Sequence, residues 1–463
     1  MQYVSTRGEA PELGFEDVLL TGLAHDGGLY VPVSWPQISP QELRQLRGAS
    51  YQDVAYQVVS KFVAGAVPAA ELKHMIAEAY ATFGHPAIAP LKQLDANQWL
   101  LELFHGPTLA FKDVAMQLLA RLMDWSLKKR GSHATIIGAT SGDTGGAAID
   151  AFKSSHNATT IILHPHGKVS NVQRRQMTTV DSPAIHNIAI EGNFDDCQAI
   201  VKTLFNDPGF RASVNLAGVN SINWARIMAQ IVYYVSSAVA LGSPDRKVSF
   251  SVPTGNFGDI FAGLAAKRMG VPIDRLIIAT NVNDILDRAM KSGRYEMQGV
   301  QASSSPSMDI QISSNFERLL YLAYGRDGSA IRSLMAGLAQ SGSFTIGQKQ
   351  LAAIREEFDS AAVNEAETAA TIAQTLHATG ELLDPHSAIG FAAARRAKAS
   401  DSAMVTLATA HPAKFPDAVE KASGVRPDLP SRLIHLLKAK ERFTIMPNSA
   451  AAVRNFILDL NKA

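Results

Sequence analysis

The segment FHGPTLAFKDVAMQ, residues 104–117, places a single lysine, Lys112, where an apolar helix begins. Lysines usually lie on the solvated face of a helix, but this one stands beside Phe111 and one turn before Met116. The positive end of the helix dipole and burial against apolar side chains both disfavour its ammonium form. A neutral amine is a nucleophile toward aldehydes, so the sequence predicts that Lys112 can form a Schiff base.

A glycine-rich loop, PTGNFGD (residues 253–259), lies between an apolar strand-like run and a helical one. Its glycines let successive backbone N–H groups turn toward one point, and the start of the helix adds positive potential. The loop lacks the Lys-Ser/Thr pair of a P-loop, and its spacing is not G-x-G-x-x-G, which disfavours a nucleotide site. Taken alone, it is equally compatible with a phosphate cradle and with a tight turn between strand and helix.

A second such loop, GATSGDTGGAA (residues 138–148), carries Ser141, Asp143 and Thr144 among four glycines. Two cradles in one chain suggest a ligand with two anionic ends, or two phosphates. The alternative is a glycine-rich loop whose polar residues only cap the following helix.

A third loop, LATAHPAKF (residues 407–415), ends a strand-like run at Thr409. A hydroxyl at the carboxyl end of a strand can bond a ring nitrogen, whereas His411 and Lys414 are also compatible with surface positions. A Schiff-base lysine together with a phosphate cradle is what pyridoxal phosphate requires of a protein.

The elements that must position these loops alternate between short apolar strands and helices from about residue 134 onward. This order predicts an α/β fold with parallel sheets covered by helices on both faces, and ligands bound at the carboxyl ends of the strands. Strands before and after a long helix near 224–242 form two groups, so we expect two α/β domains. The predicted division is an N-terminal accessory region at 1–95, a large cofactor-binding domain from 96–129 and 246–463, and a small domain at 130–245.

The amino-acid composition of the chain limits the kinds of binding partner and metal site that can be expected. The 463 residues include 43 basic and 42 acidic side chains, a balance that gives no electrostatic reason to expect nucleic acid or an anionic membrane. Cys197 is the only cysteine, which excludes an internal disulfide and a thiolate metal cluster, and no metal site is expected. The N-terminus lacks the apolar segment of a signal peptide, and the apolar run at 227–242 is short for a bilayer span and contains Gln230. We expect a soluble, cytoplasmic protein.

In combination, these motifs resemble the threonine synthase family, whose members are fold type II pyridoxal-phosphate enzymes. The resemblance rests on HGPTLAFKD, ATSGDTGGAA, GNFGD and TAHPAKF, and it extends to YVSTRG, HGKVSNVQRRQMTT, NSINWARI and DPHSAIG. The motifs run from residue 3 to about residue 420 in the family's order. The resemblance implies the fold type II architecture, with the cofactor between two parallel-sheet domains and an accessory region at the N-terminus.

The resemblance also implies roles for individual residues. Lys112 would bind pyridoxal phosphate as a Schiff base, and Thr409 would bond the pyridine nitrogen. An asparagine meets the pyridine O3′ atom in fold type II relatives, and here Asp143 occupies the matching place. The residues that would hold the cofactor phosphate, mainly through backbone N–H groups, are Gly255, Asn256, Phe257, Gly258 and Asp259.

The family's reaction converts O-phospho-L-homoserine and water into L-threonine and phosphate. Such a reaction needs a base at the substrate's α- and β-carbons, for which Lys112 is the candidate, and an anion site for the departing phosphate. The candidates for contacts with the substrate are polar residues near strand ends and at the start of the long helix: Ser141, Thr144, Lys168, Asn223 and Arg226.

Two other functions share these motifs. A related phospho-lyase would eliminate phosphate without adding water at the β-carbon, and would release 2-oxobutyrate and ammonia. A protein that only binds amino acids as a sensor is the alternative outside enzymes, and the retention of Lys112 and both glycine-rich loops argues against it.

Overall fold

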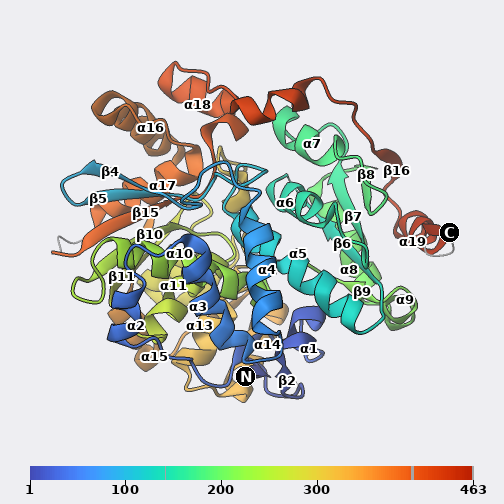
Figure 1. Cartoon of the computed structure of the whole chain (residues 1–463), viewed down its shortest axis with the longest axis horizontal. Coiled ribbons are helices and arrows are strands. Elements are labelled where there is room, and N and C mark those ends of the chain that lie inside the picture. The colour runs from blue at the N-terminus through green and yellow to red at the C-terminus, as the bar shows by residue number, and fades with distance from the viewer. Residues whose placement is uncertain (141, 398–400, 461–463) are drawn as a thin grey trace.

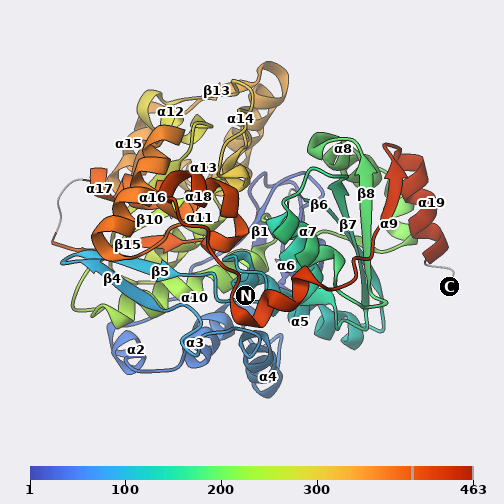
Figure 2. The same ribbon diagram turned by 90° about the horizontal axis from the view of Figure 1, so that it is seen from above.

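Two parallel sheets with helices on both faces organise the chain, as Figures 1 and 2 show. The computed structural model describes residues 1–140, 142–397 and 401–460. The larger sheet has the strand order β14-β11-β10-β15-β5-β4, and only the edge pair β4–β5 is antiparallel. Its strands are β4 (Leu91–Asp95), β5 (Gln98–Glu102), β10 (Val248–Pro253), β11 (Ile273–Thr280), β14 (Phe358–Ala362) and β15 (Ala403–Ala408).

The smaller sheet has the order β16-β8-β7-β6-β9 and is parallel throughout. Its strands are β6 (Ala134–Ala139), β7 (Ala158–Pro165), β8 (Ile185–Glu191), β9 (Leu216–Ala217) and β16 (Thr444–Pro447). The parallel sheets expected from the alternation of strands and helices are therefore present. Strand β16 comes from the C-terminal end of the chain, so residues 444–447 lie in the smaller sheet although the predicted division assigns them to the large domain.

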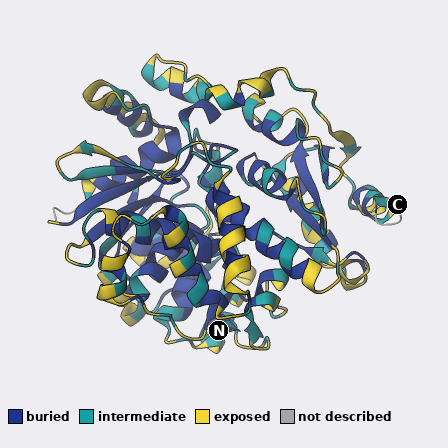
Figure 3. Ribbon diagram, viewed as in Figure 1, coloured by how far each residue is buried: buried dark blue, intermediate teal, exposed yellow. Residues whose placement is uncertain are grey.

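Burial extends over the whole length of the two central strands of the larger sheet. All six residues of β10 and of β15 are buried, because helices cover both faces of the larger sheet. Figure 3 shows the same pattern, with dark strands inside and yellow residues on the outer helices. Cys197 is fully buried in the smaller domain beside Val453 and Ile457 of the C-terminal helix, so the lone cysteine belongs to a packed core.

The helices that pack between and around the sheets have the following bounds. Near the sites discussed below are α5 (Lys112–Lys129), α6 (Asp143–Phe152), α7 (Asn171–Thr178), α10 (Trp224–Ala240), α11 (Gly258–Arg268), α17 (Pro385–Arg396), η1 (Pro306–Met308) and η2 (Pro412–Lys414). The others are α8 (Phe194–Phe205), α9 (Pro208–Ser213), α12 (Ile285–Ser292), α13 (Phe316–Ala323), α14 (Gly328–Ser341), α15 (Gln348–Glu357), α16 (Glu365–Thr379), α18 (Pro416–Ser423), η3 (Ser431–Leu437) and α19 (Ala450–Leu460). A two-stranded antiparallel sheet, β12 (Arg294–Glu296) and β13 (Ser343–Thr345), completes this part. None of the described helices is long and apolar enough to span a bilayer.

The N-terminal region packs against the start of α10. It contains a small antiparallel sheet, β1 (Gln2–Ser5), β2 (Leu13–Gly14) and β3 (Tyr30–Pro32), and the helices α1 (Phe15–Thr21), α2 (Pro40–Gln45), α3 (Tyr51–Val63) and α4 (Ala69–Tyr80). Trp224, the first residue of α10, is fully buried, with its ring centroid 5.9 Å from that of Tyr3, 6.1 Å from Trp35 and 5.6 Å from Phe62. This aromatic cluster joins the N-terminal region to the helix that begins at the predicted substrate residues.

Replacing Trp224 with alanine should lower the free energy of unfolding by about 3–5 kcal/mol, because it opens a cavity at the meeting point of three aromatic rings. Thermal unfolding followed by circular dichroism measures the effect. Trp125→Ala is the matched control, since Trp125 is only half-buried on α5 and should cost much less. Equal losses in the two variants would contradict the role assigned to the cluster.

Candidate active site

Lys112 is held at the first position of α5 by pairing with the end of the larger sheet. The backbone N–H of Phe111 donates to the carbonyl of Thr409 at 2.8 Å, and that of His411 donates to the carbonyl of Leu109 at 3.0 Å. These two bonds place the helix start directly beside the carboxyl end of β15. The Lys112 side chain lies inside the protein with 9% of its surface exposed.

The electrostatic surroundings of Lys112 favour an uncharged amine. Burial is the main cause that lowers its pKa, and the charges of Lys414 and Arg226 act in the same direction. Asp143 opposes them, because its Oδ2 atom lies 3.1 Å from the lysine Nζ. The Lys112 amine therefore loses its proton more readily than that of an exposed lysine. The Asp143 carboxylate is close enough to stabilise the ammonium form when it is present.

Asp143 lies at the first position of α6, where the second glycine-rich loop ends. Its Oδ2 accepts from Lys112 and from the Ser307 hydroxyl at 3.1 Å, and its Oδ1 accepts from Lys414 at 3.0 Å and from Gln173 at 2.9 Å. Burial alone would raise the pKa of this carboxyl, but Lys112 and Lys414 outweigh that effect and hold it well below its usual range. Asp143 is therefore ionised although it is 4% exposed.

Ser307 is a residue of the site that the sequence analysis does not identify. Its hydroxyl lies 3.5 Å from the Lys112 Nζ, and its backbone N–H donates to His386 Nε2 at 3.3 Å. The other ring nitrogen of His386 lies 2.7 Å from Asp384, so the ring carries its proton on Nδ1 and accepts at Nε2. The polar run SSSPSMDIQISSN, residues 303–315, is the signal that could have indicated a functional loop here.

The GNFGD loop presents a row of unpaired backbone N–H groups. The amides of residues 255–259 donate no hydrogen bond to any part of the chain that the structure describes. The carbonyls of the loop face away, because Ser313 donates to that of Gly255 at 2.7 Å, and Asn315 donates to that of Asn256 at 3.0 Å from its backbone. The row ends at the N-terminus of α11, which adds positive potential, so an anion fits this place.

Two features fix the shape of this row. Phe257 has a φ of +62° although it is bulky and buried, and this left-handed residue turns consecutive N–H groups toward one side. A β-carbon on Gly255 would lie 2.9 Å from the carbonyl oxygen of Ser307, closer than such atoms approach. The Asp259 carboxylate points elsewhere and accepts from Tyr233 at 2.5 Å and Tyr234 at 3.0 Å, so only its backbone N–H belongs to the row.

Thr409 stands between Lys112 and the larger sheet. Its backbone N–H donates to the Ser387 hydroxyl at 3.1 Å, whereas its own hydroxyl has no hydrogen-bond partner among the described residues. A buried amine, a free hydroxyl and a row of free amides are the donors that pyridoxal phosphate needs for its aldehyde, ring nitrogen and phosphate. These residues therefore fit that cofactor.

The glycines of the second loop serve the packing of α6 against α7. A β-carbon on Gly142 would lie 2.5 Å from the Gln173 side chain, and one on Gly145 would lie 2.4 Å from that of Thr140. The Thr140 hydroxyl accepts from both of these glycine amides at 2.9 Å. The N–H groups of Asp143 and Thr144 donate to no described residue, and Ser141 lies outside the described residues.

The remaining substrate candidates differ in their surroundings. Arg226 is buried in the first turn of α10, donates to the Val219 carbonyl at 3.3 Å, and has an Nε atom with no partner among the described groups. Burial lowers its pKa to about 10. Asn223 caps the same helix, with Oδ1 accepting from a backbone N–H and Nδ2 donating to the Leu19 carbonyl at 2.9 Å. Lys168 is exposed in the loop before α7.

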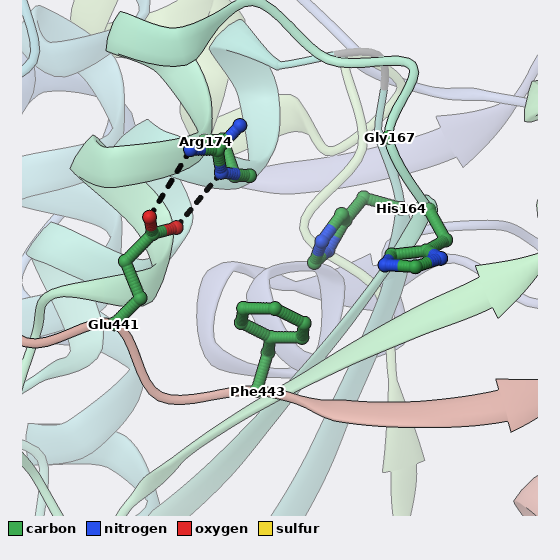
Figure 4. A pocket seen from close by; sticks show the side chains of 6 residues that line it. His164, Gly167, Arg174, Glu441 and Phe443 are labelled. Atoms are coloured by element: carbon green, nitrogen blue, oxygen red, sulfur yellow. Dashed lines mark hydrogen bonds and ion pairs between the residues drawn. The ribbon is translucent and has the colours of Figure 1, made fainter.

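A separate cavity of about 190 Å³ lies at the end of β7 and contains none of the predicted site residues. Figure 4 shows Arg174 bonded through two hydrogen bonds to Glu441, with Phe443 opposite His164. Its lining consists of His164, His166, Gly167, Arg174, Glu441 and Phe443. Burial lowers the pKa of His164 to about 4, so this ring is neutral beside the Arg174–Glu441 ion pair.

Comparison with known proteins shows which family the chain is similar to. The family model for the threonine synthase N terminus matches residues 2–80, that for pyridoxal-phosphate dependent enzymes matches residues 84–409, and that for the threonine synthase C-terminal region matches residues 387–457. A threonine synthase from Pseudomonas aeruginosa is 55% identical, with 99% of this chain and 98% of the relative covered.

Solved structures give the same result. The crystal structure of a PLP-bound threonine synthase from Brucella melitensis is 60% identical, covers 100% of both chains and has a TM-score of 0.98. The threonine synthase from yeast has a TM-score of 0.94 at 39% identity, over 100% of this chain and 99% of its own. The chain belongs to the threonine synthase family of pyridoxal-phosphate-dependent enzymes.

Proposed function

We propose that Lys112 and the groups around it carry out the threonine synthase reaction, in which O-phospho-L-homoserine and water become L-threonine and phosphate. The observation that carries this proposal is the buried Lys112 amine, 3.1 Å from Asp143, beside a row of unpaired amides. The substrate is a small molecule, and the balanced charge of the chain favours neither nucleic acid nor a membrane as partner. We place the reaction in the cytoplasm.

The hydrogen-bond donors of the site indicate which residue would bind each part of the cofactor. Pyridoxal phosphate, when bound, supplies an aldehyde for the amine of Lys112 or of the substrate and a conjugated ring that spreads negative charge away from the reacting carbons. Lys112 would bind it covalently, the amides of residues 255–259 would hold its phosphate, and the Thr409 hydroxyl would bond the ring nitrogen. Asp143 would face the ring's O3′ atom.

Lys112 is also the base. Its amine is deprotonated more easily than that of an exposed lysine, so it can take a proton from the substrate's α-carbon and then from the β-carbon. The ammonium that forms lies 3.1 Å from the Asp143 carboxylate, which stabilises it. The Ser307 hydroxyl, within 3.5 Å of the same nitrogen, restricts where the amine can move between these transfers.

Arg226 is our first candidate for the substrate phosphate. A buried guanidinium without an acidic partner is costly, and an arriving phosphate would supply the missing charge through strong, charge-assisted hydrogen bonds. The free amides of Asp143 and Thr144 lie at the start of α6 and could contact the same group. Asn223 positions the helix that carries Arg226, since both ends of its side chain are engaged.

The phospho-lyase reaction remains the competing activity. A human protein named threonine synthase-like 2 is 34% identical over the full chain, which is less than the 55% found for the threonine synthase of Pseudomonas aeruginosa. Incubation with O-phosphohomoserine separates the two activities, because a synthase yields threonine and a lyase yields 2-oxobutyrate and ammonia.

Lys112→Ala should abolish threonine formation while the protein still folds, because it removes the amine that would form the Schiff base and act as the base. Borohydride reduction followed by peptide mapping should place the cofactor on Lys112 in the parent protein. Lys128→Ala, at the exposed end of the same helix, is the control and should keep full activity. A cofactor label on another lysine would refute the assignment.

Gly255→Ala should weaken pyridoxal phosphate binding by about tenfold or more, equivalent to about 1.4 kcal/mol, because the new methyl group displaces the Ser307 carbonyl and the amide row. Equilibrium dialysis with absorbance detection measures this. Gly146→Ala is the control in the other glycine-rich loop, where a β-carbon has no neighbour closer than 3.9 Å. Full cofactor retention by Gly255→Ala would show that the cradle lies elsewhere.

Arg226→Met should lower kcat/KM for O-phosphohomoserine by about 10- to 100-fold, mainly through KM, since a hydrogen bond to a charged group contributes about 1.5–3 kcal/mol. Inhibition by inorganic phosphate should weaken in parallel. The unfolding temperature should stay constant or rise, because the change removes a buried charge without an acidic partner. Lys168→Met should have little effect, and the opposite ranking would make Lys168 the phosphate-binding cation.

A further inference from the structure

Lys414 is a second buried lysine at the site, and its environment differs from that of Lys112. It is completely buried at the end of η2. Its Nζ donates to the Thr108 carbonyl at 2.6 Å and to Gln176 Oε1 at 3.2 Å, and it lies 3.0 Å from Asp143 Oδ1. An ammonium group has three protons to donate, so these three acceptors satisfy it completely and fix its position.

Asp143 consequently lies between two lysines. Lys112 contacts its Oδ2 atom and Lys414 its Oδ1 atom. The uncharged groups that face the carboxylate are Gln173 of α7 and Ser307 of the 303–310 loop, and the His386 ring of α17 lies close enough to influence it. One carboxylate thus has two possible cationic partners, of which only Lys112 takes part in bond making.

We propose that Lys414 is the permanent counter-ion of Asp143, which keeps this carboxylate ionised while the Lys112 nitrogen gains and loses its charge. Lys414 is then a positioning residue that acts through Asp143. The inference rests on the proposed role of Lys112, because it requires that nitrogen to change its charge during the reaction.

The physical argument concerns the moments when Lys112 is neutral. With no other cation nearby, Asp143 would then be an isolated buried anion, and the cost of burial would drive it to take up a proton. A protonated Asp143 would no longer stabilise an ammonium at Lys112. Because Lys414 has no role in bond making and no freedom to move, it supplies a positive charge at every stage.

The same pairing explains how an acidic residue can stand at this position. The resemblance to fold type II enzymes implies a neutral asparagine at this position, where this chain has Asp143. The Asp143 carboxylate brings one negative charge to this position, and Lys414 brings one positive charge to its Oδ1 atom. The two residues together leave the net charge beside the ring unchanged.

A double-mutant cycle on the full-length protein tests this pairing. Lys414→Met alone should lower the unfolding temperature by about 5 °C, because it leaves a buried carboxylate with one partner fewer. Adding Asp143→Asn to it should recover a large part of that loss, both before and after removal of the cofactor. Gln173→Met is the matched control, because Gln173 bonds the same carboxylate oxygen at 2.9 Å without a charge, and it should show much weaker coupling to Asp143→Asn.

A spectral titration of the cofactor-loaded protein provides the second readout. In Lys414→Met, Asp143 and the Lys112 nitrogen should hold their shared proton to higher pH, so the midpoint of the visible absorbance change should rise by about one pH unit. Lys414→Arg retains the charge and should keep the midpoint of the parent. If Lys414→Met is insoluble alone but soluble together with Asp143→Asn, the coupling is supported; if both are insoluble, Lys414→Gln replaces Met in the cycle.

Additive effects of Lys414 and Asp143 on stability, or an unchanged titration midpoint in Lys414→Met, would overturn the inference. Lys414 would then serve only to tie η2 to the Thr108 carbonyl and to Gln176. Failure of the proposed function is a separate result, because it appears as a parent protein that makes no threonine. The stability cycle needs neither substrate nor turnover, so the two failures are distinguishable.

Discussion

The buried carboxylate of Asp143 is the constraint on which the site depends. It accepts hydrogen bonds or ion pairs from α5, α7, η2 and the 303–310 loop, four segments separated by long stretches of chain. Helices α6 and α7 follow strands of the smaller sheet, whereas η2 follows β15 of the larger one. A charge buried in this way is tolerated only when its partners are all in place, so the carboxylate makes the relative position of the two sheets a condition of stability.

This constraint reaches Lys112 through charge and through geometry. The two helix starts that carry Lys112 and Asp143 face each other, and both helix dipoles present their positive ends to the site. That arrangement lowers the proton affinity of the amine and stabilises the carboxylate. The His386–Asp384 pair holds the Ser307 backbone, which in turn keeps the serine hydroxyl between the two charged groups.

The parts of the molecule that local sequence determines could be predicted. Apolar runs such as those of β6 and β15 indicated parallel strands, because burial on both faces leaves little polar alternation. Lys112 and the GNFGD loop could be identified because helix starts and glycines have consequences within a few residues. The assignment of individual residues to cofactor and substrate stays a prediction, as does the division into domains.

Contacts made over long sequence separations could not be predicted. Lys414 is compatible with the surface in its local sequence, and it is buried because Thr108 and Gln176, 306 and 238 residues away, meet it in space. Ser307 follows a stretch without regular strands or helices, where no periodicity indicates what the chain approaches. Strand β16 is mostly exposed, and its four residues pair with β8 at the edge of the smaller sheet.

The two candidate anion sites use different donors, and the difference suits their tasks. The amides of residues 255–259 are rigid dipoles with no net charge, so they can hold a phosphate that stays bound without adding a formal charge to the protein. The Arg226 side chain carries a full charge, donates one hydrogen bond among the described residues and lies at a helix start. In the proposed role it would bind strongly only while a phosphate offsets the cost of its burial. A departing phosphate leaves the arginine free for the next substrate, because the protein supplies no acidic group to replace it among the described residues.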